Sequence, residues 1–335
     1  MRYILCPLCG SNEHQVVSRF SGPWNFRMPV VICKSCGFLF RNPQWDEDEA
    51  KKHYKKISRY YTLFHGNPRL SETRSNDEYK RAIPRLEWVQ KYIKFPAKIL
   101  DVGAGSGAFV ELANQSGAQA IGIELDKDAV QIAQRKGIPM ELTSLEDSFF
   151  HPNSFDVITM FHVLEHVTNL HTFIMKAQNL LRPGGFLFIE VPDTSTLRER
   201  PKYYFVPEHN WNFTSQSLTR LFSQQGGWEI IEVNNELGPY SHAYNVLLFV
   251  VKKDLSQEAQ VINSNSDDYK RMVCFLQELE EKTTSALPLG VKVREKLSLL
   301  LGPWLGLFGF KFIYKIYYIS LLLHNSIKNM KNSRK

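Results

Sequence analysis

Three closely spaced glycines in the first half of the chain could let a cofactor lie directly against the backbone. Residues 99–107 read Ile-Leu-Asp-Val-Gly-Ala-Gly-Ser-Gly. Because glycine has no Cβ, Gly103, Gly105 and Gly107 allow a sharp turn and the close approach of a ligand. An apolar stretch precedes them and a helical pattern follows at 108–114. The segment therefore predicts a strand, turn and helix that bind a nucleotide-like cofactor.

The acids near this turn bear on which cofactor binds. The spacing Gly103-x-Gly105-x-x-Ala108 fits the dinucleotide fingerprint, and Glu124 ends the next apolar stretch, where an acid would bind ribose hydroxyls. NAD is therefore one candidate. Asp101, however, lies two residues before the first glycine, where it would repel a pyrophosphate and could hold a cationic amino-acid group. This acid favours a cofactor that carries an ammonium group.

Five segments, in order, resemble the motifs of class I S-adenosylmethionine-dependent methyltransferases. They are residues 100–107, 123–126, 154–159, 161–167 and 180–190. The resemblance implies that the glycine turn passes under the methionine part of S-adenosyl-L-methionine and that Glu124 binds its ribose. It places Leu145 and Glu146 beside the adenine. The cofactor-binding residues expected from it are Asp101, Gly103, Gly105, Gly107, Glu124, Leu125, Leu145, Glu146 and Phe161.

Four of the five cysteines have the spacing of a metal site. Cys6 and Cys9 form one C-x-x-C pair and Cys33 and Cys36 another, with 23 residues between the pairs and a glycine after each. Each pair can present two thiolates on one tight turn, and four sulfurs complete a tetrahedral zinc site with no open position. We expect a structural Zn²⁺ ribbon, with four free thiols as the alternative. The fifth cysteine, Cys274, fits a small core residue.

Two histidines, His162 and His209, are candidate catalytic residues. His162, Glu165 and His166 match the H-x-x-E-H metalloprotease pattern, but that enzyme needs both histidines on one helix and this segment begins at a strand end. Ubiquinone-pathway O-methyltransferases use an E-x-x-E-H segment here for a divalent cation. Here His162 replaces the first acid, which argues against magnesium. An unbound histidine is therefore favoured, and a divalent metal held by this segment is the alternative.

His209 follows the methyltransferase-like segment at 180–190, in a stretch rich in aromatic and polar residues that includes Tyr203. In related methyltransferases a histidine at this place lies near the transferred methyl group. A neutral imidazole can take a proton near pH 7, so His209 is the leading candidate for a general base. The alternative is that His209 only packs against the loop or hydrogen-bonds it.

The elements that must position these residues alternate between strand and helix patterns. Strands are expected near 98–102, 119–124, 138–142, 155–160, 185–191, 228–234 and 243–251, with helices between them. A short loop separates the last two, so one of them should be antiparallel. The pattern and the resemblance predict an α/β fold with a Rossmann-like, seven-stranded, mostly parallel sheet, helices on both faces and a ligand crevice at the carboxyl ends of the strands.

Four regions are expected along the 335 residues. They are a zinc ribbon at 1–45, a helical linker or lid at 46–95, a methyltransferase domain at 96–252 and a helical, basic and aromatic extension at 253–335. The formal charge of +7 is uneven, because residues 288–335 carry +8 and the rest of the chain sums to −1. A nearly neutral body argues against a nucleic acid partner. The tail could contact a membrane surface peripherally, or pack as an ordinary helix pair.

These features together define the expected function. The chain shows neither a signal peptide nor an apolar run of membrane-spanning length, and its cysteine usage suits a reducing compartment, so a cytoplasmic enzyme is expected. A ribbon followed by a methyltransferase resembles bacterial enzymes that methylate sugar nucleotides. We expect a small-molecule, saccharide or glycolipid acceptor with O-methylation favoured over C-methylation. An RNA or protein methyltransferase and a non-catalytic cofactor-binding protein are the alternatives.

Overall fold

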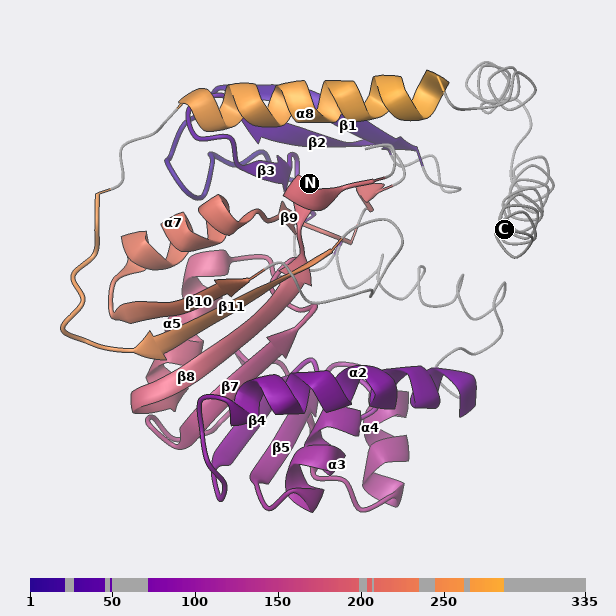
Figure 1. Ribbon diagram of the computed structural model, residues 1–335, viewed down its shortest axis with the longest axis vertical. Helices are drawn as coiled ribbons and strands as arrows, with labels where there is room; N and C mark the ends of the chain where they lie inside the picture. The colour runs from indigo at the N-terminus through magenta and orange to yellow at the C-terminus, as the bar shows by residue number, and fades with distance from the viewer. Residues whose placement is uncertain are drawn as a thin grey trace, which may run out of the picture.

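The chain forms two sheets, one above the other in Figure 1, and the smaller lies beyond the carboxyl ends of strands of the larger. The computed structural model describes residues 1–21, 27–45, 49, 72–198, 204–206, 208–234, 245–261 and 266–285. Of the expected linker or lid at 46–95, residues 46–48 and 50–71 fall outside these residues. Tyr203 and the basic aromatic tail at 288–335 lie wholly outside them.

The larger sheet has seven strands in the order β10-β11-β8-β7-β4-β5-β6. The strands are β4 (Lys98–Val102), β5 (Gln119–Glu124), β6 (Met140–Leu142), β7 (Phe155–Phe161), β8 (Leu181–Pro192), β10 (Trp228–Asn234) and β11 (Val246–Lys253). Six strands run in the same direction, and β11 runs antiparallel to both of its neighbours, β8 and β10. This confirms the predicted fold class and the single reversed strand. β8 begins earlier than expected because Leu181 already pairs with Phe155.

Helices cover both faces of this sheet. On one face pack α2 (Glu72–Gln90), α3 (Ala108–Gln115) and α4 (Lys127–Arg135), and on the other α5 (Leu170–Leu180) and α7 (Ser215–Gln225). Neighbouring residues of β4 show the division: Ile99 belongs to the core under α2 and α3, whereas Leu100 belongs to the core under α5 and α7. Side chains alternate across a strand, so an uninterrupted apolar run such as Ile99-Leu100 is what a sheet covered on both faces requires.

The smaller sheet contains the cysteine-rich amino-terminal segment and one distant strand. Its order is β1 (His14–Ser21), β2 (Arg27–Cys33), β3 (Leu39–Arg41) and β9 (Trp211–Asn212). All its pairs are antiparallel, and β3 pairs with β9 through Leu39 opposite Asn212 and Phe40 opposite Trp211. The sheet that begins in residues 1–45 is therefore completed by a segment that follows His209.

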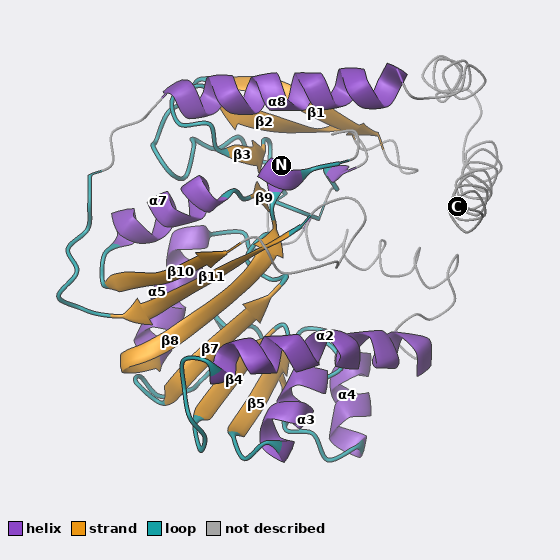
Figure 2. Cartoon of the chain, viewed as in Figure 1, coloured by secondary structure: helices purple, strands orange, loops and turns teal. Residues whose placement is uncertain are grey.

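A long helix, α8 (Ser266–Ser285), lies along the smaller sheet (Figure 2). Its buried Leu276 packs against Val30, Ile32 and Leu39 of that sheet. The side chain of Tyr269 donates a hydrogen bond to Gln15. Among the described residues, no helix is long and apolar enough to cross a membrane.

Candidate functional site

The glycine turn between β4 and α3 has the backbone conformation that its sequence predicts. Gly103, Gly105 and Gly107 have φ of +69°, +56° and +80°, which places all three in the left-handed region that favours glycine. A Cβ on Gly103 would lie 2.6 Å from Val163 Cγ2, so this glycine is needed for packing. A Cβ on Gly105 would meet no atom within 4 Å. The turn at Gly105 therefore faces open space in which a ligand can lie.

Glu124, at the end of β5, holds its carboxylate against this turn. Its Oε2 accepts a hydrogen bond from the Gly105 N–H at 3.0 Å, and its Oε1 accepts from the N–H groups of Leu125 and Asp126 at 2.7 and 2.9 Å. The structure thus brings together two residues, 19 positions apart, that were both expected to bind the cofactor. A carboxylate offers about four lone pairs, so ribose hydroxyls can still donate to Glu124.

The other residues expected to bind adenine or the rest of the cofactor differ in exposure. Leu145 is buried, Glu146 is exposed, and Leu125 is 73% exposed beside Glu124. Phe161, at the end of β7, is buried with its ring 5.1 Å from that of Phe109. An exposed leucine next to the acid that is expected to bind ribose suits the predicted edge of an adenine site, because an adenine would cover it.

Asp101 is buried in β4, next to the turn. Its Oδ1 accepts a hydrogen bond from Thr159 Oγ1 at 2.6 Å, and the residue is 3% exposed. Burial raises the pKa of Asp101 to about 7, although the Thr159 hydroxyl and the charge of Arg85 both oppose that rise. A cation bound beside Asp101 would stabilise the ionised carboxylate. The predicted role of Asp101, to hold an ammonium group, therefore suits its environment.

A chain of alternating charges runs from α2 to the end of β7. Arg85 on α2 donates two hydrogen bonds to the carboxylate of Glu190, which lies near the end of β8. His162 Nε2 lies 3.1 Å from Glu190 Oε1, and His162 Nδ1 lies 3.1 Å from Glu165 Oε1. Both carboxylates are 1% exposed. His162 thus bridges two buried acids, and its backbone adopts a left-handed φ of +58° to do so.

This geometry determines the protonation state of His162. Burial alone would lower the pKa of its imidazole, but the hydrogen bonds to Glu165 and Glu190 raise it to about 9. Burial likewise opposes ionisation of the two acids, yet the bond from His162 lowers the pKa of each to about 2. At neutral pH His162 is an imidazolium with both N–H groups donated. It suits positioning of the two acids better than removal of a proton.

A second cluster lies next to this chain of charges, in the segments that follow β7 and precede β9. His166 Nδ1 lies 3.1 Å from the carbonyl oxygen of Glu208, and the ring of His166 meets the ring of His209 edge-on at 4.9 Å. Glu165, His166 and His209 bring one potential ligand atom each to within 4.8 Å of one another. Glu165 Oε2 is buried, and among the described residues no group donates a hydrogen bond to it.

The cluster keeps His209 neutral. Burial, and then the nearby charge of His166, lower the pKa of His209 to about 3. A neutral imidazole can accept a proton or bind a metal ion. Two imidazoles and one carboxylate suit a transition metal better than magnesium, which prefers oxygen ligands. The metal alternative therefore falls on His209 and the Glu165-His166 pair, and it does not include His162.

The cysteine pairs converge as their spacing predicts. Cys6 and Cys36 Sγ lie 3.5 Å apart, Cys9 and Cys33 Sγ also 3.5 Å, and all four sulfurs lie within 4.8 Å of one another without a disulfide. Zinc bonded to four sulfurs at about 2.3 Å needs them about 3.8 Å apart.

The charges of the four sulfurs also indicate a bound cation. Shared hydrogen bonds among the sulfurs raise the pKa of Cys6 and of Cys36 and lower the pKa of Cys9 and of Cys33. Four thiolates this close together repel one another, so a cation is needed to keep all four ionised, and the donor set fits structural zinc. The fifth cysteine differs from its prediction. Cys274 is exposed on α8 rather than buried in a core, because that helix buries only a narrow face against the smaller sheet.

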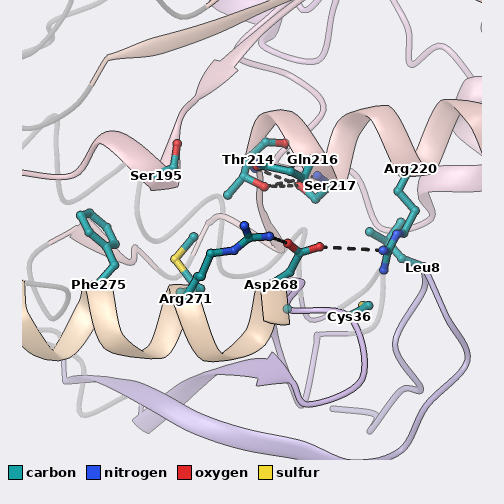
Figure 3. A pocket seen from close by; sticks show the side chains of 12 residues that line it. Leu8, Cys36, Ser195, Thr214, Gln216, Ser217, Arg220, Asp268, Arg271 and Phe275 are labelled. Atoms are coloured by element: carbon teal, nitrogen blue, oxygen red, sulfur yellow. Dashed lines mark hydrogen bonds and ion pairs between the residues drawn. The ribbon is translucent and has the colours of Figure 1, made fainter. Parts of the chain in front are cut away.

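A cavity of about 280 Å³ lies between the cysteine turns, the start of α7 and the start of α8 (Figure 3). Its charged groups neutralise one another in part, since Asp268 Oδ1 lies 2.5 Å from Arg271 Nη2 and Asp268 Oδ2 lies 3.9 Å from Arg220 Nη2. None of the predicted cofactor-binding residues lines this cavity. It is separate from the site at the glycine turn.

Comparison with known proteins identifies a methyltransferase domain in the chain. A family model described as a methyltransferase domain matches residues 71–233. The ubiquinone biosynthesis O-methyltransferases of Thiobacillus denitrificans and Chromobacterium violaceum are 35% and 32% identical to this chain over 130 residues, which are 36% of this chain and 54% of each relative. The chain thus spans about half the length of these curated relatives.

Solved structures include a similar protein with a bound ligand. The 1,6-didemethyltoxoflavin-N1-methyltransferase of Burkholderia thailandensis was crystallised with 1,6-didemethyltoxoflavin and S-adenosylhomocysteine. It is 15% identical to this chain, with a TM-score of 0.47 over 65% of this chain and 96% of that one. From the family match, the ordered motifs and the seven-stranded sheet, residues 71–233 belong to the methyltransferase domain family, of the class I, S-adenosylmethionine-dependent type.

Proposed function

We propose that the chain transfers a methyl group from S-adenosylmethionine to an oxygen atom of a small-molecule or saccharide acceptor. One observation carries the proposal. An open glycine turn flanked by Asp101 and Glu124 shares the carboxyl edge of the sheet with the cluster of Glu165, His166 and His209. Because β4 and β7 are adjacent parallel strands, the residues that follow them meet at one edge.

The cofactor side of this site matches the groups of S-adenosylmethionine. Gly105 gives open space against which the methionine part can lie, Glu124 can accept hydrogen bonds from the ribose hydroxyls, and Asp101 can pair with the α-ammonium group. This pairing also explains why a buried carboxyl is kept at a place where burial raises its pKa.

The acceptor side must position an oxygen and remove its proton. In an in-line transfer the oxygen donates an electron pair to the methyl carbon, the carbon–sulfur bond breaks, and its electrons stay on sulfur to give S-adenosylhomocysteine. The hydroxyl proton becomes strongly acidic as the new bond forms, so even a weak base such as His209 can take it. The nearby carboxylate of Glu165 stabilises the resulting imidazolium, since its charge favours protonation of His209.

A specific observation favours a second route to the same product. Glu165, His166 and His209 would hold a divalent transition metal, and the contact from His166 Nδ1 to the Glu208 carbonyl is the kind of bond that orients a metal-binding imidazole. Such an ion would lower the pKa of a bound hydroxyl group. In both routes His162 keeps Glu165 ionised and in place.

The wider setting of this activity is also part of the proposal. The near-neutral charge of residues 1–287 supports a small acceptor over RNA. The order of ribbon and methyltransferase domain supports a sugar-linked or glycolipid acceptor, and the charge of +8 on residues 288–335 supports a cytoplasmic enzyme that touches the inner face of the membrane.

Labelled methyl transfer tests the proposal. The full chain is incubated with S-adenosylmethionine labelled in the methyl group and with separate pools of sugar nucleotides, phenols and catechols, glycolipids, RNA and protein. We expect label in one small-molecule or lipid pool and an equal amount of S-adenosylhomocysteine. Label in RNA or protein alone would show a macromolecule methyltransferase. Cofactor binding with no label in any pool would favour a non-catalytic protein, and either result overturns the proposal.

A further inference from the structure

We propose that the ribbon is a working part of the active site, because Arg41 and Asn210 link its metal-binding turns to the cluster of Glu165, His166 and His209. The inference rests on the proposed function and names two positioning residues for it. Neither residue carries a sequence signal for catalysis. Their contacts show that the ribbon does not fold as a separate module.

The ribbon and the methyltransferase domain share one core. Phe38 of the ribbon stacks on Trp211 with ring centroids 6.2 Å apart and contacts Phe213 at 5.8 Å. Cys6, Cys33 and Cys36 belong to the same buried cluster as residues of β7, β8 and α7. Together with the pairing of β3 and β9, this leaves little freedom for the ribbon to move relative to the segment that carries His209.

Asn210 is the point at which the two parts are joined. Its backbone N–H donates to the Glu165 carbonyl at 2.8 Å, and its side-chain Nδ2 donates to the carbonyls of His166 at 2.8 Å and Val167 at 3.0 Å. The residue is 4% exposed. One buried amide therefore fixes the backbone of the segment that presents Glu165 and His166, and it directly follows His209.

Arg41 connects this amide to the ribbon. Its backbone N–H donates to the Asn210 carbonyl at 2.9 Å, and its guanidinium donates to Asn210 Oδ1. The guanidinium also lies over the ring of Trp45, 4.2 Å from its centroid. Because the Asn210 side chain accepts from Arg41 and donates toward the active site, both sides of the amide are used. A change on the ribbon side is thus transmitted to the histidine segment.

The path from the metal-binding turn to Arg41 is short. The Cys33 N–H donates to the Phe38 carbonyl at 2.9 Å, and β3 runs from Leu39 to Arg41. Zinc ribbons depend on their metal for folding, so loss of the ion should release β3, and with it Arg41. Removal of zinc is then expected to loosen the active-site histidines and to leave the glycine turn in place.

Hydrogen exchange on the full chain tests this coupling without an acceptor. Zinc-loaded protein is compared with chelated protein and with zinc-loaded Arg41→Lys and Asn210→Asp. We expect faster exchange at 162–168 and 208–213 in all three, and unchanged exchange at the glycine turn, 103–107. The matched control is Arg182→Lys, whose ion pair with Asp156 lies at the other end of the sheet. Changes confined to residues 1–45, or spread evenly over the chain, would overturn the proposal.

Kinetics then separate positioning from simple stability. With the acceptor found by labelled transfer, Arg41→Lys and Asn210→Asp should each lower kcat roughly tenfold to a hundredfold, the effect of losing one charge-assisted or multiply shared hydrogen bond. The Kd for S-adenosylhomocysteine and the zinc content should stay at wild-type values. The double variant should lose little more than either single one, because both act through one amide.

Two kinetic results would contradict the positioning role. One is an unchanged kcat in both single variants. The other is a parallel loss of cofactor affinity, which indicates general destabilisation. The exchange experiment still decides whether the ribbon and the histidine segment are coupled if no acceptor is methylated, so failure of the proposed function and failure of this inference can be told apart.

Discussion

Replacement of Asp101 by asparagine should have opposite effects on the stability of the free protein and on its affinity for the cofactor. Asparagine keeps the Oδ1 atom that accepts the hydrogen bond from Thr159 and removes the charge. In the free protein that charge is buried, and its burial raises the pKa of Asp101. In the complex the same charge is expected to pair with the ammonium group of the cofactor.

The size of the stability effect follows from the pKa. The carboxyl ionises near 3.8 in an unfolded chain and near 7 in the folded protein. Between these values the folded state holds a proton that the unfolded state has lost, so stability falls as the pH rises and stays low above pH 7. The difference corresponds to ~4 kcal/mol, at about 1.4 kcal/mol for each pKa unit. Asp101→Asn should recover up to this amount at pH 8 and almost none at pH 4.

The assay combines urea unfolding at pH 4 and pH 8 with calorimetric titration of S-adenosylhomocysteine. The variant should be more stable than the wild type at pH 8, and its Kd should be about tenfold to a hundredfold higher. Wild-type affinity should increase from pH 6 to pH 8 as Asp101 ionises. The exposed Asp267 on α8 provides the control Asp267→Asn, which should change neither quantity. A less stable variant at pH 8, or unchanged cofactor affinity, would refute the reasoning.

Four further outcomes are expected. Cys33→Ser should lower the thermal midpoint of unfolding and the zinc content together, and a full zinc complement would contradict the four-sulfur site. His209→Ala should slow turnover at least about tenfold with the Kd for S-adenosylhomocysteine unchanged. A turnover rate equal to that of the wild type would show that His209 is not the general base. His162→Gln should cost roughly 3 kcal/mol in urea unfolding at pH 6, and the difference should vanish as the pH passes about 9, since the raised pKa of His162 stabilises the fold only while the ring is protonated. Liposome co-sedimentation should weaken when residues 288–335 are removed, and equal pelleting would rule out the membrane contact.

The parts of the site that the sequence predicts are those with local signals. The glycine turn, Asp101 and Glu124 belong to a short strand–turn–helix–strand segment. The C-x-x-C spacing of each cysteine pair indicates that its two sulfurs lie on one tight turn. The strand pattern likewise predicts the seven-stranded sheet, because a strand covered on both faces must be apolar throughout. In each case the residues that specify the feature lie close together in the sequence, so their pattern can be recognised without knowledge of the fold.

The parts that the sequence does not predict depend on distant pairs. Arg85 and Glu190 are 105 positions apart, and Arg41 and Asn210 are 169 apart. Arg85 lies in an ordinary polar helix pattern, and β9 is only two residues long, so neither shows a periodicity that would identify its partner. The protonation state of His162 could not be predicted for the same reason. It depends on Glu190, which lies on a distant strand, as much as on Glu165, which is nearby in the sequence.

Cofactor choice is the central claim, and a competition experiment tests it most directly. The full, zinc-loaded chain is titrated calorimetrically with S-adenosylhomocysteine, alone and in the presence of excess NAD, and Glu124→Ala is titrated in the same way. The account predicts one S-adenosylhomocysteine site per chain, no displacement by NAD and a clear loss of affinity in Glu124→Ala. Binding of NAD that displaces S-adenosylhomocysteine, or no binding of S-adenosylhomocysteine at all, would contradict it.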